Sequence, residues 1–263
     1  MQTIGLIVAY DGTPFSGWQR QEGSRTIQGE LENALSRINA MPTQVRGASR
    51  TDAGVHAEWQ VAAFETPRNY APERWVQAIN ATTPPEIMVR RAFVAPDFFQ
   101  PRFASRGKHY RYLVWQGNFV PPHLVHRAAR TRVLDVENMR RAAASLLGEH
   151  DFSAFRAIDC QAKSPVRTLT RLDISVSRPH FEYPCEDGGA LIQFDVEGTA
   201  FLKQMVRIMV GTLIEFGTGR PSEEMAEILE SRTRVRAGQT APACGLTLMR
   251  SFCDDAFGSV GSE

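Results

Sequence analysis

The sequence predicts an α+β fold in which two ferredoxin-like halves (strand, helix, strand, strand, helix, strand) share one antiparallel sheet. Three observations predict it. Short apolar runs alternate with segments of helical spacing, their order repeats loosely along the chain, and a segment interrupted by proline, 96–106, separates the two repeats as a linker. We therefore divide the chain into an N-terminal half, 1–104, and a C-terminal half, 105–263, with a catalytic cleft between them.

The first half opens with an apolar run at 4–10, which predicts a strand. Thr26 is a suitable helix N-cap, and apolar residues follow it at helical spacing as far as Ile38. Further strands are expected at 43–48, 59–66 and 87–94, with a second helix at 72–79.

The second half repeats this order less regularly, and the same patterns predict its elements. Strands are expected at 108–115, 169–176, 190–196 and 246–252, and helices at 136–147, 199–216 and 222–230.

Composition is that of a globular protein of 263 residues, 43% of them hydrophobic. We expect a cytoplasmic location, because no apolar run is long enough for a signal peptide or a membrane span. The four cysteines form no Cys-x-x-Cys pair, which favours reduced thiols over disulfides or a structural zinc site. The net charge of +1 does not indicate nucleic acid. Arginine greatly outnumbers lysine, which suits contacts with phosphate and bases but also fits a general compositional bias.

Candidate chemistry begins in the polar run from Ser49 to Asp52, which ends in Ala53-Gly54 between two expected strands. One interpretation is a turn, in which Asp52 binds backbone amides and Gly54 supplies a positive φ. The other makes Asp52 a catalytic carboxylate, with Arg50 beside it.

Arg207 lies in the middle of the expected helix 199–216, which is apolar nearly all round. A buried guanidinium needs a carboxylate or a bound anion. Arg207 therefore pairs either with Asp52 or, structurally, with Glu215 or Asp195. Lys203, one turn earlier, faces solvent or meets phosphate.

Two further segments carry aromatic side chains. The strand at 108–115 places Tyr110 and Tyr112 on one face, which suits either the core or a platform for stacking bases. The loop after the first strand presents Trp18, Gln19 and Arg20, which suit a polar ligand unless Trp18 is tucked into the core.

A zinc nucleobase deaminase is one alternative class, because His56-Ala57-Glu58 fits half of its signature. Pro184-Cys185 could begin the other half, but the second cysteine is missing at Gly188. One cysteine and one histidine do not make the three-ligand site, so no metal is expected.

Taken together, these segments resemble tRNA pseudouridine synthase A, the TruA family, as far as Phe252. The longest match is Arg-Thr-Asp-Ala-Gly-Val-His-Ala at 50–57. The others are Tyr-Asp-Gly…Phe-Ser-Gly-Trp-Gln-Arg-Gln at 10–21, Tyr-Arg-Tyr at 110–112, Met-Val-Arg…Val-Gly at 205–211 and Ala-Pro…Gly-Leu at 241–246.

The resemblance implies that Asp52 is the catalytic carboxylate, Arg207 its partner, Tyr110 the active-site tyrosine and Arg50 an RNA-binding residue. It also implies a homodimer that isomerises uridines thirty-eight to forty of the tRNA anticodon arm without metal or organic cofactor. Further RNA contacts are expected from Trp18, Gln19, Arg20, Lys203 and Leu246. The rival interpretations are a non-catalytic RNA-binding protein and a pseudouridine synthase for another RNA.

Overall fold

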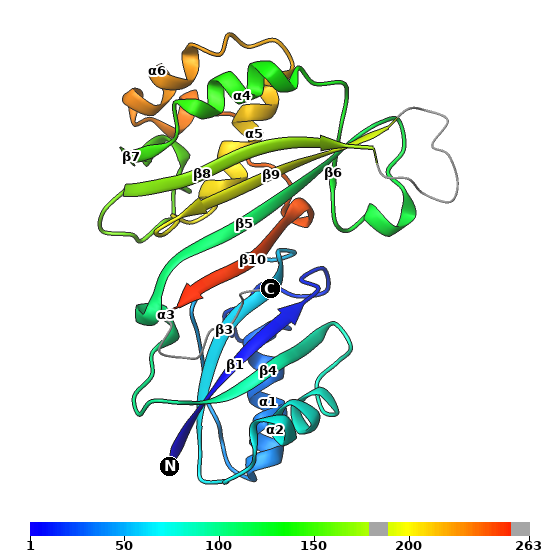
Figure 1. Cartoon of the computed structure of the whole chain (residues 1–263), viewed down its shortest axis with the longest axis vertical. Coiled ribbons are helices and arrows are strands. Elements are labelled where there is room, and N and C mark those ends of the chain that lie inside the picture. The colour runs from blue at the N-terminus through cyan, green and yellow to red at the C-terminus, as the bar shows by residue number, and fades with distance from the viewer. Residues whose placement is uncertain (179–188, 254–263) are drawn as a thin grey trace. The chain divides into compact units, whose positions relative to one another are not determined.

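The computed structural model describes residues 1–178 and 189–253, which divide into two compact units (Figure 1). Unit 1 contains Met1–Lys108 and the last described strand from Thr247 onward, and unit 2 contains His109–Leu246. The division falls a few residues after the boundary expected at 104. The strand expected to close the C-terminal half belongs to unit 1, so the chain returns to the unit in which it began.

Unit 1 is built on a sheet with the strand order β4-β1-β3-β10, and β2 pairs with the end of β3. β1 runs antiparallel to β3 and β4, whereas β10 runs parallel to β3. In Figure 1 the helices α1 and α2 lie on one face of this sheet. The bounds are β1 Gln2–Tyr10, α1 Ile27–Asn39, β2 Val45–Gly47, β3 His56–Thr66, α2 Pro72–Asn80, β4 Ile87–Ala95, α3 Pro101–Ala104 and β10 Leu246–Cys253.

The strands and helices expected in the first half are all present, with ends that differ by a few residues. Thr26 caps α1 as predicted, because its Oγ1 accepts a hydrogen bond from Gly29 N at 3.2 Å. The expected linker 96–106 is more than a connection: it contains α3, and Phe99 packs in a buried cluster with Ile7 and Val61.

Unit 2 has the strand order β5-β9-β8-β7, and the short β6 pairs with β5 in parallel. β8 is antiparallel to both β9 and β7. Figure 1 shows α4, α5 and α6 together on one face of β8 and β9. The bounds are β5 Ser105–Gln116, β6 Ala129–Thr131, α4 Val136–Ala144, β7 Gly148–Asp151, β8 Val166–Ser177, β9 Ala190–Gly198, α5 Met205–Gly217 and α6 Glu224–Ser231.

The helix expected at 199–216 was placed too early, since α5 begins only at Met205. Gln204, immediately before it, has a φ of 60° in the left-handed region, which a regular right-handed helix does not contain. Lys203 therefore precedes the helix, and Arg207 lies in its first turn rather than in its middle.

Among the described cysteines, Cys160, Cys244 and Cys253 form no disulfide. Cys185 and Pro184, which entered the deaminase alternative, lie outside the described residues. Within the described ranges, no helix combines the length and apolar character needed to cross a membrane.

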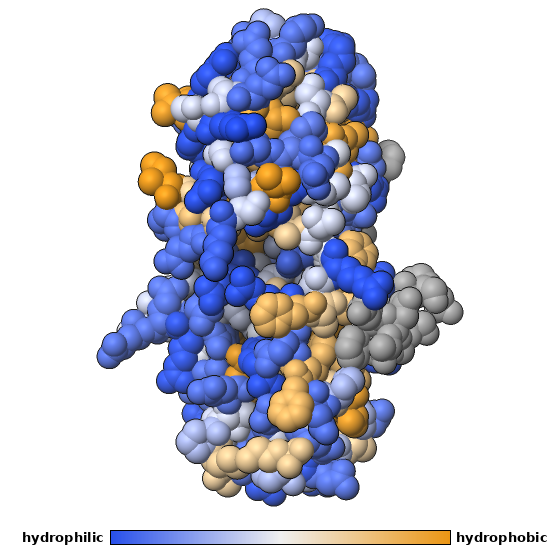
Figure 2. Space-filling view, turned by 90° about the vertical axis from the view of Figure 1, so that its left-hand side faces the viewer, coloured by the Kyte–Doolittle hydropathy of each residue, from blue (hydrophilic) through white to orange (hydrophobic). Residues whose placement is uncertain are grey.

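The face drawn in Figure 2 is mainly hydrophilic, and its apolar side chains form small separate groups. Scattered exposed apolar side chains are normal for a globular protein. This face thus suits a polar or charged partner better than an apolar one.

Candidate active site

Asp52 lies in the loop that joins β2 to β3, within unit 1. Val55 N donates a hydrogen bond to the Asp52 carbonyl oxygen at 3.1 Å, and Gly54 has a φ of 77°. The predicted turn is therefore confirmed, including the positive φ at Gly54. The Asp52 side chain is half-buried on this turn.

Gln60, on β3, holds the start of this loop. Its Oε1 accepts from Ser49 N at 3.2 Å, and its Nε2 donates to Ser49 O at 2.7 Å. Gln60 is fully buried. A buried amide with both of its polar atoms paired is a rigid support, because breaking either bond leaves a desolvated polar group.

Residues of β1 and the loop after it hold the middle of the Asp52 loop. Tyr10 Oη and Thr51 Oγ1 are hydrogen-bonded at 2.8 Å, and Trp18 N donates to Thr51 O at 3.1 Å. The pairing of β1 with β3 shifts register between Val8 and Tyr10, so the strand is irregular where it approaches the loop.

Two glycines allow the loop after β1 to come this close. A Cβ on Gly12 would lie 2.0 Å from Val55 O, and one on Gly17, whose φ is 90°, would lie 2.6 Å from Thr51 O. Neither position has room for a side chain. Gly12 N also donates to Nδ1 of the fully buried His56 at 3.1 Å. The histidine of the deaminase alternative thus has a structural role here.

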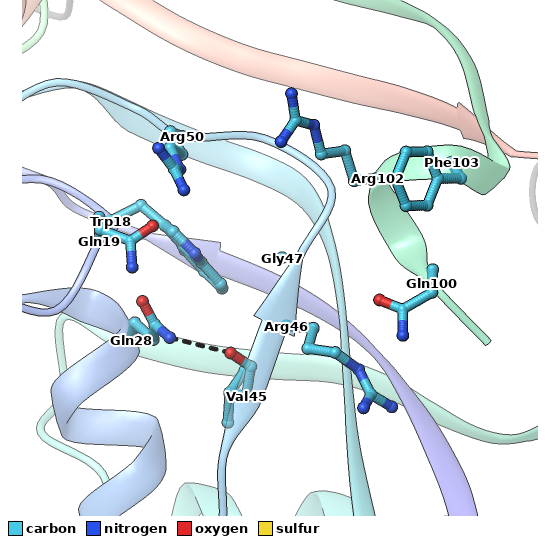
Figure 3. A pocket seen from close by; sticks show the side chains of 10 residues that line it. All are labelled: Trp18, Gln19, Gln28, Val45, Arg46, Gly47, Arg50, Gln100, Arg102 and Phe103. Carbon is cyan, nitrogen blue, oxygen red and sulfur yellow. Dashed lines mark hydrogen bonds between the residues drawn. The ribbon is translucent and has the colours of Figure 1, made fainter. Parts of the chain in front are cut away.

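Three of the predicted RNA-binding residues line one cleft of about 450 Å³ in unit 1, shown in Figure 3. They are Arg50, Trp18 and Gln19. Trp18 is only 2% exposed, so the simpler interpretation that it is tucked into the core is correct. Arg20 does not line the cleft, and its Nη1 donates to Glu32 Oε2 at 2.9 Å.

Tyr110 lies on β5 in unit 2, and its side chain is buried against Phe201. The two rings meet edge to face, with centroids 5.1 Å apart and an interplanar angle of 85°. The predicted alternation along β5 is confirmed: Tyr110 and Tyr112 are buried, whereas His109 and Arg111 are partly exposed. Tyr112 Oη donates to Pro242 O at 2.7 Å, and burial raises the pKa of this phenol far above its usual value.

Arg207 is half-buried, and its Nε donates to Ala241 O at 2.9 Å. The two acids considered as its structural partners bind other cations. Asp195 pairs with His109 and Arg111, and Glu215 pairs with Arg220. An arginine in the first turn of a helix meets the positive end of the helix dipole, so a nearby anion stabilises it.

Asp195 shows how unit 2 pairs a buried charge. Its Oδ1 lies 2.6 Å from His109 Nε2 and accepts from Arg111 Nε at 3.0 Å. Burial by itself raises the pKa of this carboxyl, but hydrogen bonds from His109, Arg111 and Gln193 outweigh it and hold the pKa well below the usual range.

The remaining predicted residues of unit 2 take different positions. Lys203 is exposed and forms an ion pair with Asp159. Leu246, the first residue of β10, is buried. The interpretation that Lys203 faces solvent is confirmed, whereas its ion pair with Asp159 was not expected.

Sequence reasoning missed several residues that shape the site. Gln60 and Tyr10 support the Asp52 loop, yet nothing in the sequence distinguishes either from an ordinary strand residue. Arg46, Gln100 and Arg102 complete the cleft. The only sequence signal for them was the basic character of the segment 96–106 around Arg102.

Comparison with known proteins agrees with these features. Residues 6–104 and 142–252 match the model of a family described as tRNA pseudouridine synthase. The chain is 45% identical over 259 residues to tRNA pseudouridine synthase A of Myxococcus xanthus, which covers 97% of this chain and 93% of the relative. It is 41% identical over 254 residues to the enzyme of the same name from Acetivibrio thermocellus, covering 96% and 100% of the two chains. For the one from Geobacter sulfurreducens the identity is 42% over 252 residues, covering 95% and 99%.

These matches include the Asp52 loop and both units. The chain therefore belongs to the tRNA pseudouridine synthase family.

Proposed function

We propose that this protein isomerises uridine to pseudouridine in transfer RNA, at positions thirty-eight to forty of the anticodon arm, with Asp52 as the catalytic carboxylate. The observation that carries the proposal is the placement of Asp52 on a turn held by β1 and β3, in a chain of this family. Such support keeps a reacting group in one geometry, which is what catalysis requires.

The reaction is an internal exchange of bonds, so it needs no oxidant or second substrate. The bond from C1′ to N1 breaks, the bond from C1′ to C5 forms, N1 gains a proton and C5 loses one. An ionised Asp52 attacks C1′, adds to C6, or removes the C2′ proton to give a glycal. These three routes remain alternatives.

We assign Arg207 as the partner of the Asp52 carboxylate in the working enzyme. Its place in the first turn of α5 favours a nearby anion, and Asp195 and Glu215 pair with other cations. A guanidinium beside Asp52 would keep the carboxylate ionised and oriented.

We assign Tyr110 two roles. The uridine must leave its stack before its sugar carbon is accessible, at a cost of a few kcal/mol, and stacking on an aromatic ring offsets about 1 to 3 kcal/mol of that cost. The Tyr110 hydroxyl is also our candidate for the base that removes the C5 proton. Tyr110→Phe should then stall after the new C–C bond forms. A variant that instead releases tritium from C5 at the normal rate, without completing the product, would exclude this role.

Substrate contacts are proposed for Arg50, Gln19, Arg20, Lys203 and Leu246. Trp18 is assigned a contact only through the part of its ring that lines the cleft, because the rest is buried.

We further propose that both units follow the ferredoxin-like pattern. In unit 1 the strand order and the pairing of β2 with β3 support this. A cytoplasmic homodimer completes the proposal, and a monomeric mass in light scattering would rule out the dimer.

The test compares wild type, Asp52→Asn and Asp97→Asn on unmodified tRNA transcripts, without added metal and with EDTA. Asp97 is an exposed aspartate of unit 1, so its substitution is the matched control for the loss of one carboxylate. Pseudouridine is mapped by carbodiimide-dependent primer-extension stops. We expect stops in the anticodon arm with wild type and Asp97→Asn, and none with Asp52→Asn.

Other outcomes separate the alternatives. Stops at other positions would keep the reaction and reassign its target. Tight tRNA binding by wild type without any stop would favour a non-catalytic RNA-binding protein.

A further inference from the structure

The charged residues that line the cleft in Figure 3 are all positive. Of the ten residues that line it, Arg46, Arg50 and Arg102 are cationic and none is acidic. They come from β2, from the Asp52 loop and from α3, so three separate segments of unit 1 bring positive charge to one place. Like charges gathered in this way repel one another unless an anion lies between them.

Protein groups leave much of this charge uncompensated. Within the described residues, the side chains of Arg50 and Arg102 make no hydrogen bond or ion pair, and the same holds for Gln19 and Gln100. Arg46 Nη1 donates to Glu65 Oε1 at 2.9 Å, but Arg46 Nε and Nη2 are buried and have no partner in the described part of the chain. A buried guanidinium nitrogen without an acceptor is costly, so it favours a ligand that accepts hydrogen bonds.

The floor of the cleft is fixed before any ligand binds. Gln28 Nε2 donates to Val45 O at 2.9 Å, the bond drawn in Figure 3, while Gln28 Oε1 accepts from Arg20 N at 2.9 Å. The Trp18 ring lies against Gly47, where an added Cβ would be 2.6 Å from the ring. A preformed site loses less entropy on binding.

The rim adds a feature that inorganic phosphate or an acidic peptide would not use. Phe103, on α3, lines the cleft and is 83% exposed. An exposed ring beside a basic cleft is the arrangement that binds single-stranded nucleic acid, with bases stacked on the ring and phosphates on the cations. The carboxamides of Gln19 and Gln100 offer both donors and acceptors to the edge of a base.

We propose that this cleft binds one unpaired nucleotide of the RNA substrate, with its phosphate held by Arg102 and Arg46 and its base stacked on Phe103. The volume of about 450 Å³ is within the range of small-ligand sites. Arg50, two residues before Asp52 in the same loop, links the cleft to the proposed catalytic carboxylate. The bound nucleotide is therefore a near neighbour of the isomerised uridine, an assignment that depends on the proposed function.

The first test uses anticodon-arm RNAs in which one phosphate at a time is replaced by a neutral methylphosphonate. Wild type, Arg102→Gln and Arg37→Gln are compared, since Arg37 is an exposed arginine on α1 that does not line the cleft. One methylphosphonate should weaken binding by wild type about tenfold, the size of one charge-assisted contact. Arg102→Gln should bind unmodified RNA about tenfold more weakly and be insensitive to that same methylphosphonate, while Arg37→Gln behaves as wild type.

The second test addresses the base. Phe103→Ala should weaken RNA binding about tenfold, in the range of one stacked base, and an abasic nucleotide next to the sensitive phosphate should remove the difference from wild type. Phe98→Ala is the control, because Phe98 is 86% exposed in unit 1 but does not line the cleft.

The outcomes separate this site from the proposed reaction. If wild type forms pseudouridine but the effects of Arg102→Gln and every methylphosphonate simply add, the nucleotide site is refuted. Equal RNA affinities of Phe103→Ala and Phe98→Ala would also refute it. Coupling at one phosphate without any pseudouridine would support the site and refute the proposed function instead.

Discussion

Gln60 and Ser49 are joined by two reciprocal hydrogen bonds, one to the amide and one to the carbonyl of Ser49, at 3.2 and 2.7 Å. This pair connects the sheet of unit 1 directly to the loop that carries Asp52. The Gln60 side chain thus fixes the start of the loop that carries Asp52, the proposed catalytic carboxylate.

Gln60→Leu should both destabilise the protein and slow the reaction. The leucine side chain is similar in size but has no polar atoms, so it leaves the Ser49 amide and carbonyl unpaired, at about 1 to 3 kcal/mol for each buried group. Urea unfolding and kcat with tRNA measure the two effects. Gln44→Leu, at an exposed position, is the control and should change neither. A Gln60→Leu variant with wild-type kcat would show that this bond pair does not position Asp52.

Gly12→Ala should be more harmful than Gly23→Ala. The added methyl group at Gly12 would lie 2.0 Å from Val55 O, so the backbone of the Asp52 loop must move, at a typical cost of about 1 to 3 kcal/mol. Gly23 has open space around it and only the cost of its φ of 70°. Thermal unfolding ranks the two variants, and the prediction fails if Gly23→Ala is the less stable one.

The Asp195 cluster should make stability depend on pH. The folded pKa of Asp195 is depressed, so its contribution is complete above the unfolded value of about 3.9 and is lost as the pH falls toward the folded value. Asp195→Asn should cost about 1.5 to 3 kcal/mol at neutral pH. The gap between wild type and Asp195→Asn, measured by denaturant titration, should narrow below about pH 4. A gap that stays constant into acid would contradict this account.

Tyr112→Phe should show the opposite pH dependence. Tyr112 donates to Pro242 O, and its raised pKa keeps the folded side chain protonated, so removing the hydroxyl should cost about 1 kcal/mol near neutral pH. Above about pH 10 the unfolded tyrosine ionises while the folded one does not, which lowers the stability of wild type. The unfolding free energies of wild type and Tyr112→Phe, measured at several alkaline pH values, should therefore converge. A gap that stays constant as the pH rises would mean that Tyr112 ionises in the folded protein as readily as in the unfolded chain.

Local patterns were sufficient for most of the secondary structure. The Thr26 cap, the alternation along β5 and the turn at Gly54 depend on neighbouring residues, so the sequence shows them directly. The start of α5 was missed because an apolar run continues through Phe201 and Leu202, and periodicity does not reveal the left-handed backbone at Gln204. The segment 96–106 was expected to be only a linker for a similar reason. Its prolines indicate a break in regular structure, but they do not show that Phe99 is buried.

The sequence by itself determined the order of the elements, the motif around Asp52 and hence the family. Only the tertiary structure decided that β10 joins unit 1, that Gln60 holds Ser49, and that Arg46 and Arg102 meet at one cleft. The physical reason is the distance along the sequence between the residues that interact. Helix caps, turns and strand alternation arise from residues a few positions apart, whereas a cleft or a buried amide pair joins segments that only the folded chain brings together.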